Sequence, residues 1–269
     1  NSLRVVFSNN IFPKGINQNR HFSPPISLLS ISIKNAKIFA GALTTNEKNR
    51  QIQIRKGILN MKYIIFDLDG TLWDATENIR KSWNIAIQDF DELKGTEISL
   101  KQLQSVMGLP MDEIATKLFP SLMKDKQLEV LDRCCVVENE YLEKNGGTLY
   151  PMVEETLATL SKNHKLCIVS NGQAGYIQAF LAAHKLDKYF VDYQNWGDNQ
   201  VPKGENIKLV VKRNNIKTAA YVGDTMGDFT AAKTAGIDFI YAEYGFGNID
   251  NIKECAYVIN QFSDLLNIV

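Results

Sequence analysis

Short apolar runs alternate with helical patterns over most of the chain. Runs long enough for buried strands cover residues 63–66, 166–169, 219–222 and, more weakly, 239–241. Between them, apolar positions recur at helical spacing over about 153–163, 174–185, 204–214 and 228–235. Because strand and helix patterns alternate, we predict an α/β fold with a parallel sheet and helices on both of its faces.

The alternation is interrupted between the first two strands. Residues 76–144 show helical patterns alone, and the last of them, about 124–144, is long enough for roughly five turns. Gly146 and Gly147 then lead the chain back toward the sheet. An all-helical insertion directly after the first strand is typical of a lid, with the glycine pair as its hinge.

The first 60 residues lack a sustained period of either kind and differ in charge. They contain nine Lys and Arg but a single acidic residue, Glu47, so their formal charge is +8 against −8 for the remainder. Three interpretations stay open: an organelle transit peptide, residues upstream of a true start at Met61, or a functional arm. In each case we expect this segment to carry no chemistry.

These patterns divide the chain into three parts. We predict an unstructured or non-native extension over 1–60, a core domain formed by 61–75 and 148–269, and a helical cap domain over 76–147. We expect a cytoplasmic protein with reduced thiols, or an organellar one if the extension is a transit peptide.

Composition and charge exclude several classes of protein. The 269 residues are 45% hydrophobic and carry 30 basic against 30 acidic side chains, which is typical of a globular protein and predicts no nucleic-acid partner. No run approaches the ~18 apolar residues of a membrane span, so we expect no membrane partner. The four cysteines form neither a C-x-x-C pair nor a Cys-x5-Arg loop, and the three histidines are scattered, which argues against zinc-histidine and Ser-His-Asp chemistry.

Polar clusters follow the predicted strands at their carboxyl ends. Asp67 and Asp69 follow the first strand, Ser170-Asn171-Gly172 the second and Asp224 the third. Lys203 lies at a predicted helix start, and Asp228 is four residues beyond Asp224. Since ligands of open α/β sheets bind outside the carboxyl ends of the strands, we expect these groups to form one site.

These clusters resemble the four motifs of the haloacid dehalogenase-like (HAD) hydrolases. Phe66-Asp67-Leu68-Asp69-Gly70-Thr71 resembles the first motif, Ser170-Asn171-Gly172 the second, Lys203 the third and Gly223-Asp224-Thr225-Met226-Gly227-Asp228 the fourth. The resemblance covers about 61–269 and is nearest to the phosphoglycolate-phosphatase-like group, whose helical C1 cap is inserted between the first two motifs. It implies a Rossmann-like core. Lys203 departs from the pattern, because Pro202 precedes it whereas many relatives have a proline after the lysine.

The residue types suit phosphoryl transfer, which requires positioning and stabilisation of negative charge. Asp67 can attack phosphorus in line and form an aspartyl-phosphate, and Asp69 can protonate the leaving oxygen and later deprotonate water. The alternative interpretation of the two carboxylates is a turn or helix-cap pair. Ser170, Asn171 and Gly172 would bind the phosphoryl oxygens, and Lys203 would supply fixed positive charge unless it is an ordinary surface lysine.

Carboxylates that converge on a phosphate require a cation between them. Asp67, Asp224, Asp228 and the Asp69 carbonyl are expected to hold Mg²⁺, with Mn²⁺ as the alternative metal. For Asp228 the other interpretation is a helix N-cap.

The helical cap is expected to choose the substrate. Gly108 and Pro110 lie where relatives have a specificity loop, although a plain helix-helix turn explains them equally well. Trp73 and Arg80 are further candidates for substrate specificity, with core packing and a solvated helix face as their alternatives, and Trp83 shares the packing alternative.

The combined prediction is a Mg²⁺-dependent phosphatase of a small phosphorylated metabolite, such as phosphoglycolate, a sugar phosphate or a nucleotide. A β-phosphoglucomutase-like phosphomutase and an inorganic pyrophosphatase stay open, because cap contacts decide between them. Dehalogenation is disfavoured because Asp69 and the metal pair would be superfluous. A non-catalytic binder is disfavoured because every motif residue is present. A monomer or homodimer is expected.

Overall fold

The computed structural model describes residues 61–107, 109, 111–250 and 252–269. The expectations for residues 1–60, Gly108 and Pro110 lie outside the described residues. Within the described part, six strands form one sheet in the order β5-β4-β1-β6-β7-β8, and every neighbouring pair is parallel. The strands are β1 (Tyr63–Phe66), β4 (Lys165–Ser170), β5 (Phe190–Asn195), β6 (Ala219–Gly223), β7 (Asp238–Ala242) and β8 (Tyr257–Ile259).

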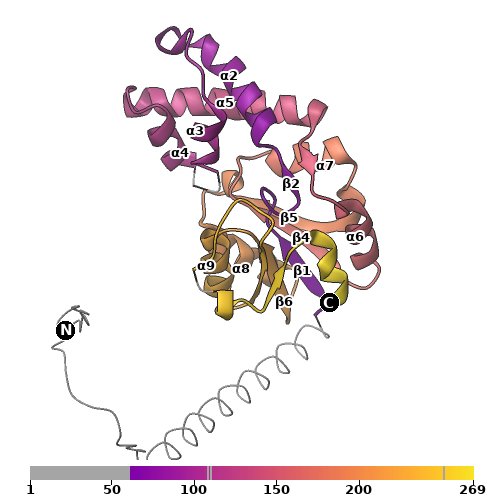
Figure 1. Cartoon of the computed structure of the whole chain (residues 1–269). Helices are drawn as coiled ribbons and strands as arrows, with labels where there is room; N and C mark the ends of the chain where they lie inside the picture. Colours follow the sequence, from indigo (N-terminus) through magenta and orange to yellow (C-terminus); the bar gives the residue numbers. More distant parts are fainter. Residues whose placement is uncertain (1–60, 108, 110, 251) are drawn as a thin grey trace, which may run out of the picture. The chain divides into compact units, whose positions relative to one another are not determined.

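Helices cover both faces of the sheet, so the predicted α/β class is confirmed. α8 (Lys203–Arg213) and α9 (Met226–Ala235) lie on one side, and α6 (Val153–Leu160) and α7 (Tyr176–His184) lie on the other (Figure 1). The short 3₁₀ helices are η1 (Ile87–Asp89), η2 (Asp91–Leu93), η3 (Asp187–Tyr189), η4 (Trp196–Asp198), η5 (Ile252–Glu254) and η6 (Phe262–Asn267).

The sheet has a buried apolar layer on each face because successive side chains of a strand point in opposite directions. In β1, Ile64 and Phe66 belong to the cluster beneath α6 and α7, whereas Ile65 belongs to the cluster beneath α8 and α9. All three are fully buried, as are Ala220 and Tyr221 of the neighbouring strand β6. A strand buried on both faces appears in the sequence as a continuous apolar run, which explains why the central strands could be predicted.

The two edge strands β5 and β8 were absent from the prediction. β5 has the sequence FVDYQN, with Val191 and Tyr193 exposed, and β8 spans three residues. An edge strand pairs on one side only and is covered less completely, so its sequence lacks the apolar run of a central strand.

The described residues of 76–145, called the helical segment below, fold into helices joined by short connections, as predicted. The segment contains α2 (Thr76–Ala86), α3 (Leu100–Gln104), α4 (Met111–Leu118) and α5 (Lys124–Asn145), which lie together beyond one end of the sheet (Figure 1). α5 packs against α2, and the side chains buried on α5 recur at helical spacing, as in Cys134, Glu138 and Leu142. α3 begins with a capping box formed by Ser99 and Gln102.

A two-stranded ribbon marks the passage between these helices and the sheet. β2 (Trp73–Asp74) pairs antiparallel with β3 (Thr148–Leu149), so the chain leaves and re-enters at the same place. Gly146 ends α5 with φ +65°, a conformation that favours glycine, and its amide donates to the Leu142 carbonyl at 2.8 Å.

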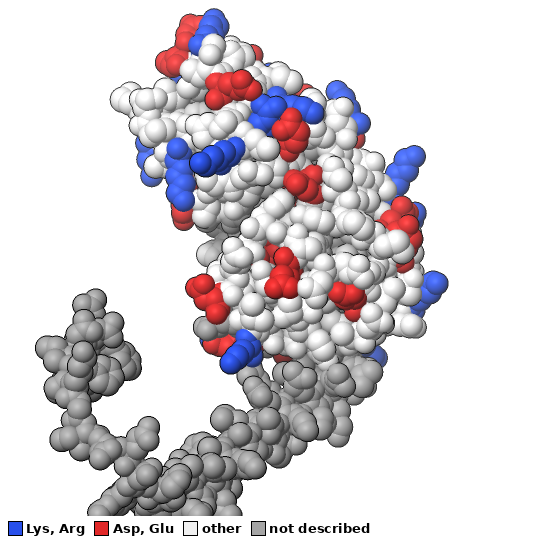
Figure 2. All heavy atoms as spheres, in the orientation of Figure 1, with Lys and Arg blue, Asp and Glu red and all other residues white. Residues whose placement is uncertain are grey.

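The surface carries charges of both signs. On the face that Figure 2 shows, Lys and Arg side chains are interspersed with Asp and Glu over both the helical segment and the sheet-bearing part. Among the described residues, no helix combines the length and apolarity that a membrane crossing requires.

Candidate active site

The predicted site residues meet at the carboxyl ends of the three central strands β4, β1 and β6. Asp67 follows β1, Ser170 ends β4 and Asp224 follows β6. Lys203 is the first residue of α8, and Asp228 lies in the first turn of α9. Residues separated by up to 161 positions therefore share one edge of the sheet, because parallel strands bring their carboxyl ends together.

The loop after β1 turns tightly against Asp224. The amides of Thr71, Leu72 and Trp73 all donate to the Leu68 carbonyl, and Gly70 has φ +78°. A Cβ atom added at Gly70 would lie 2.3 Å from Asp224 Oδ2, closer than any real contact. Glycine is thus required here both by the backbone conformation and by the approach of the Asp224 carboxylate.

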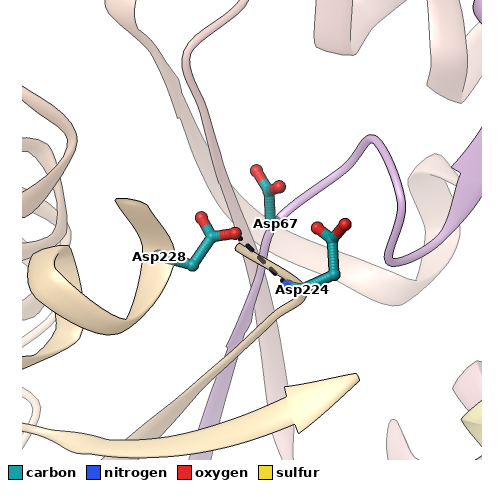
Figure 3. Close-up of side chains that lie close together, drawn as sticks. All are labelled: Asp67, Asp224 and Asp228. Atoms are coloured by element: carbon teal, nitrogen blue, oxygen red, sulfur yellow. Dashed lines mark hydrogen bonds between the residues drawn. The ribbon is translucent and has the colours of Figure 1, made fainter. Parts of the chain in front are cut away.

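Three carboxylates converge at the end of the sheet. Asp67, Asp224 and Asp228 each offer an oxygen that lies within 4.8 Å of the other two, and Figure 3 shows the three side chains close together, from the loop after β1, the end of β6 and α9. Asp67 is 5% exposed, and Asp224 and Asp228 are fully buried. Such close burial of like charges is costly unless cations lie between them.

Lys203 supplies one of those cations. Its Nζ donates to Asp67 Oδ1 at 2.8 Å and to Asp228 Oδ1 at 2.7 Å, and the side chain is only 8% exposed. The alternative of an ordinary surface lysine is therefore wrong. Although burial opposes its charge, the carboxylates of Asp228 and Asp67 raise the pKa of Lys203 above its usual range.

The lysine does not neutralise the whole cluster. Burial and the neighbouring Asp228 raise the pKa of Asp67 to about 6 in spite of Lys203. Burial, together with Asp228 and Asp67, raises the pKa of Asp224 to about 8. One lysine among three carboxylates leaves negative charge that a further cation would stabilise.

The two carboxylate oxygens of Asp224 differ in their hydrogen bonding to the described residues. Its Oδ2 accepts from the amides of Phe246 at 2.7 Å and Gly247 at 3.2 Å. Its Oδ1 is buried and has no hydrogen-bond partner among the described residues. An orphaned buried carboxylate oxygen beside two further carboxylates fits a hard divalent cation such as Mg²⁺ or Mn²⁺.

Asp228 combines a place in this cluster with a local structural role. Its Oδ2 accepts from the amides of Asp224 and Thr225 and from the Thr225 hydroxyl, at 3.2, 3.0 and 2.7 Å. The helix cap itself is Thr225, with Asp228 as the third-position partner of a capping box. The bonds to Oδ2 fix the direction of Oδ1, which is the atom that meets Lys203.

Asp69 is held by two donors. Its Oδ1 accepts from the Tyr176 hydroxyl at 2.7 Å and from the indole Nε1 of Trp73 at 3.0 Å. Burial raises the pKa of Asp69 to about 8, although the hydrogen bond from Tyr176 opposes the rise. A carboxyl with this pKa can carry a proton near neutral pH, which suits a general acid.

The Ser170–Gly172 turn contributes polar groups beside Asp67. It follows β4, which flanks β1 on the side opposite to β6 and Asp224. Ser170 is 2% exposed, and its Oγ accepts from the Gly172 amide at 3.1 Å. Together with Asn171, these residues line a cavity between the sheet end and the helical segment.

The cavity is small and combines polar and apolar walls. Its volume is about 160 Å³, below the ~300–1,000 Å³ of ordinary ligand pockets. Its lining from the sheet end comprises Asp67, Asp69, Ser170, Asn171, Gly172, Gln173, Tyr176, Lys203, Thr225, Phe246 and Gly247. Its lining from the helical segment comprises Ile79, Trp83, Leu103, Gln104, Val106, Met107, Leu109, Ile114 and Glu138. A small metabolite matches this size.

Two of the predicted specificity residues do not line the cavity. Trp73 is fully buried and acts on the site through its hydrogen bond to Asp69. Arg80 forms ion pairs with Glu77 and Glu97, at 2.9 and 2.8 Å. Contact of Trp73 and Arg80 with substrate therefore stays a prediction, whereas Trp83 does line the cavity.

Sequence reasoning missed Tyr176, Gln173 and Glu138. Tyr176 and Gln173 follow the Ser170–Gly172 turn closely, and their proximity to a predicted phosphate site was the available signal. Glu138 gave no signal of its own, because an acidic residue in a helix is ordinarily solvated. Only the packing of α5 over the sheet end brings it into the cavity.

Comparison with known proteins extends the likeness over nearly the whole described chain. The sequence profile described as haloacid dehalogenase-like hydrolase matches residues 64–242. A phosphoglycolate phosphatase of Vibrio parahaemolyticus is 26% identical over 224 residues, which cover 78% of this chain and 96% of the relative. A probable phosphatase of Dickeya dadantii, IndB, is 27% identical over 213 residues, which cover 76% and 91%.

Solved structures show the same fold. The crystal structure of a predicted phosphoglycolate phosphatase from Haemophilus somnus aligns with a TM-score of 0.67 and 24% identity, covering 77% of this chain and 97% of that one. A putative phosphatase from Clostridium difficile aligns with a TM-score of 0.62 and 27% identity, covering 78% and 98%. The profile match spans every strand-end residue from Asp67 to Asp228.

Proposed function

Since the chain belongs to the haloacid dehalogenase-like hydrolases and is a phosphatase, we propose that it hydrolyses phosphomonoesters of small metabolites through an aspartyl-phosphate on Asp67. The observation that carries this proposal is the placement of Asp67. Its carboxylate meets Lys203 at 2.8 Å and lines the same cavity as Asp69 and Ser170. Nucleophile, acid and fixed positive charge therefore face one space.

Asp67 is the proposed nucleophile. Lys203 holds its Oδ1, so the attack on phosphorus falls to the other carboxylate oxygen. The new O–P bond forms as the bond to the leaving alcohol oxygen breaks, and the positive charge of Lys203 stabilises the charge on the transferring group.

Asp69 is the proposed general acid and base. Its protonated carboxyl gives the proton to the leaving alcohol oxygen. The resulting carboxylate then takes a proton from the water that attacks phosphorus in the aspartyl-phosphate, and the bond between the Asp67 oxygen and phosphorus breaks, which releases inorganic phosphate and restores the Asp67 carboxylate. Tyr176 and Trp73 fix the carboxyl in place from the side of Oδ1.

Asp67, Asp224, Asp228 and the Asp69 carbonyl are the proposed ligands of Mg²⁺, with Mn²⁺ as the alternative. The orphaned Oδ1 of Asp224 and the uncompensated charge of the three carboxylates support this assignment. When bound, the ion would neutralise charge on the phosphoryl oxygens. Ser170, Asn171 and Gly172 are the proposed donors to the same phosphoryl group.

Residues 76–147 are proposed to form a cap domain over a core of 61–75 and 148–269. Support comes from the paired strands β2 and β3, which bring both connections to one place, and from the cavity that the helices share with the sheet end. Movement of the cap domain about this ribbon would open the cavity to admit substrate and close it to exclude water.

Phosphate release from a panel of esters tests the proposal. Phosphoglycolate, sugar phosphates, nucleoside monophosphates, p-nitrophenyl phosphate and inorganic pyrophosphate are incubated with the protein and Mg²⁺, and with EDTA in place of Mg²⁺. Release from a monoester that depends on the metal is expected. Hydrolysis confined to pyrophosphate, or interconversion of sugar-phosphate isomers without release, would overturn the proposal in favour of a pyrophosphatase or a phosphomutase.

Tyr176→Phe is expected to move the alkaline limb of the pH–rate profile to higher pH. Asp69 must carry a proton to act as acid, and the Tyr176 hydroxyl stabilises its charged form. Removal of that hydrogen bond therefore raises the pKa of Asp69 further and delays the loss of activity above about pH 8. The measurement is kcat/KM against pH.

Tyr244→Phe is the matched control for this shift. The Tyr244 hydroxyl donates to the Thr71 carbonyl at 2.8 Å in the same loop and does not contact Asp69. Its removal is expected to leave the limb unchanged. If the alkaline limb of the Tyr176→Phe profile stays in place or moves to lower pH, the result contradicts the role of Asp69 as acid.

Mg²⁺ is expected to raise the melting temperature, and Asp224→Asn is expected to lose most of that rise. A ligand that binds the folded state alone stabilises it by about 2.7 kcal/mol at a hundred times its dissociation constant. The amide side chain of the variant would keep an oxygen but lose the negative charge of the carboxylate, whose Oδ1 has no hydrogen-bond partner among the described residues. Asp187→Asn, at an exposed position, is the control and should keep the full rise. An equal rise in Asp224→Asn would remove Asp224 from the ligand set.

A further inference from the structure

A buried glutamate reaches the cavity from the helical segment. Glu138 lies on α5 between Cys134 and Leu142, at positions that the helix buries, and is 3% exposed. A leucine would suit this stripe, and a carboxylate is costly to bury unless it meets donors. Its presence in the wall of the cavity therefore requires an explanation beyond packing.

Two fixed donors use part of the capacity of Glu138. Its Oε2 accepts from the indole Nε1 of Trp83, and its Oε1 accepts from Gln173 Nε2 at 3.1 Å. A carboxylate has about four acceptor sites, so each oxygen keeps a second one. These bonds hold the group rigid in the cavity wall and leave it able to accept from a bound molecule.

Apart from Gln104, the remainder of this wall is apolar, and its described residues include no Lys or Arg. Around Glu138 the helices contribute Ile79, Trp83, Leu103, Val106 and Met107. Among the described lining residues, Lys203 is the sole Lys or Arg, and it is held between Asp67 and Asp228 at the sheet end. Burial raises the pKa of Glu138 to about 7 although the hydrogen bonds from Gln173 and Trp83 oppose the rise. Above that pH, a second anionic group on a substrate would face a buried carboxylate without a counter-ion.

We propose that the cavity selects phosphomonoesters whose alcohol ends in a hydrogen-bond donor, a hydroxyl or an ammonium group that Glu138 accepts, and rejects those that end in a carboxylate. This inference rests on the proposed function, because it assigns the phosphoryl group to the sheet end and the alcohol to the helices. Several relatives are named as phosphatases of phosphoglycolate, which ends in a carboxylate, so the selection proposed here differs from the substrate that their names give. Like charges brought together at a buried contact strongly disfavour the wrong ligand.

Three esters of nearly equal size test the selection. 2-Hydroxyethyl phosphate, O-phosphoethanolamine and phosphoglycolate differ at the far end only, as hydroxyl, ammonium and carboxylate. With Mg²⁺ present at pH 8, where Glu138 with its pKa of about 7 is mostly ionised, kcat/KM for the first two is expected to exceed that for phosphoglycolate by about 100-fold. A preference for phosphoglycolate would overturn the inference while leaving the phosphatase intact.

The Glu138→Gln variant tests whether Glu138 causes this substrate preference. The amide keeps an acceptor but loses the charge, so kcat/KM for phosphoglycolate should rise and that for O-phosphoethanolamine should fall, each by about 10-fold. Glu140→Gln, exposed on the same helix, is the control and should change neither. Equal changes for all three esters would reduce Glu138 to a structural role and overturn the inference.

Misfolding of the variant and failure of the proposed function can each be recognised. If Glu138→Gln does not fold by its melting curve, the comparison of the three esters with the unmodified protein decides the inference. If the unmodified protein releases phosphate from none of these esters and none of the larger panel, the proposed function itself fails, and the inference with it.

Discussion

Asp67→Asn is expected to abolish phosphate release while the protein stays folded. The amide cannot attack phosphorus, so kcat should fall by a factor on the order of 10⁴–10⁶, the scale seen when a covalent nucleophile is removed. Hydroxylamine trapping of the acyl phosphate during turnover should detect an adduct in the unmodified protein and none in the variant. Substantial residual release would show that another group attacks.

The same substitution is expected to leave stability unchanged or to raise it by about 1 kcal/mol in EDTA. Asp67 is buried beside Asp228, and the rise of its pKa to about 6 means that its charged form is disfavoured in the folded state. The folded state therefore favours protonated Asp67, and this contribution to the free energy of unfolding is present at acid pH and lost as the pH rises through about 6. Because the amide is neutral at every pH, its effect on stability should be largest above that pH. Urea unfolding at pH 8 measures it, with Asp187→Asn as the exposed control.

Lys203→Met is expected to have the largest effect on stability. Lys203 bridges Asp67 and Asp228, and its loss leaves three carboxylates within 4.8 Å of one another without a cation. Breaking a buried ion pair by removal of one partner costs about 3–5 kcal/mol. Urea unfolding in EDTA should show this loss, and Mg²⁺ should restore part of it because the ion would neutralise the same charges.

Lys208→Met is the matched control on the same helix. Lys208 is exposed and pairs with Glu205 at 2.7 Å, so its removal should change the free energy of unfolding by no more than about 0.5 kcal/mol. Adding Asp67→Asn to Lys203→Met should recover part of the lost stability, because one of the crowded charges is then absent. A Lys203→Met protein as stable as the unmodified one in EDTA would show that the carboxylates are not charged together.

The central sheet could be predicted because its strands are buried on both faces. The expected runs 63–66, 166–169, 219–222 and 239–241 all lie within observed strands, and the four helices between them were placed within a few residues. The strand-end residues followed from the same reasoning, since topology alone brings Asp67, Ser170 and Asp224 to one edge. Strands β5 and β8 escaped prediction because edge strands need no continuous apolar run.

The orientation of helices over the sheet could not be predicted from local patterns. Arg80 on α2 was a candidate for substrate contact, and in the structure it pairs with Glu77 and Glu97 and is not among the residues that line the described cavity. A helical period shows which residues share a face but not what that face meets. Tyr176 and Gln173 entered the site for the same reason, through the angle at which α7 and its preceding turn approach Asp69 and α5.

The sequence by itself determined the α/β class, the helical insertion and the carboxylates, serine and lysine at the strand ends, because burial and strand termini leave a local pattern. Tertiary structure alone decided that Lys203 bridges Asp67 and Asp228, that Asp224 keeps an oxygen without a partner among the described residues, and that Glu138 faces the cavity. Each of these depends on side chains from separate elements that come within a few ångströms, and such contacts arise from packing between elements rather than from the order of residues within one.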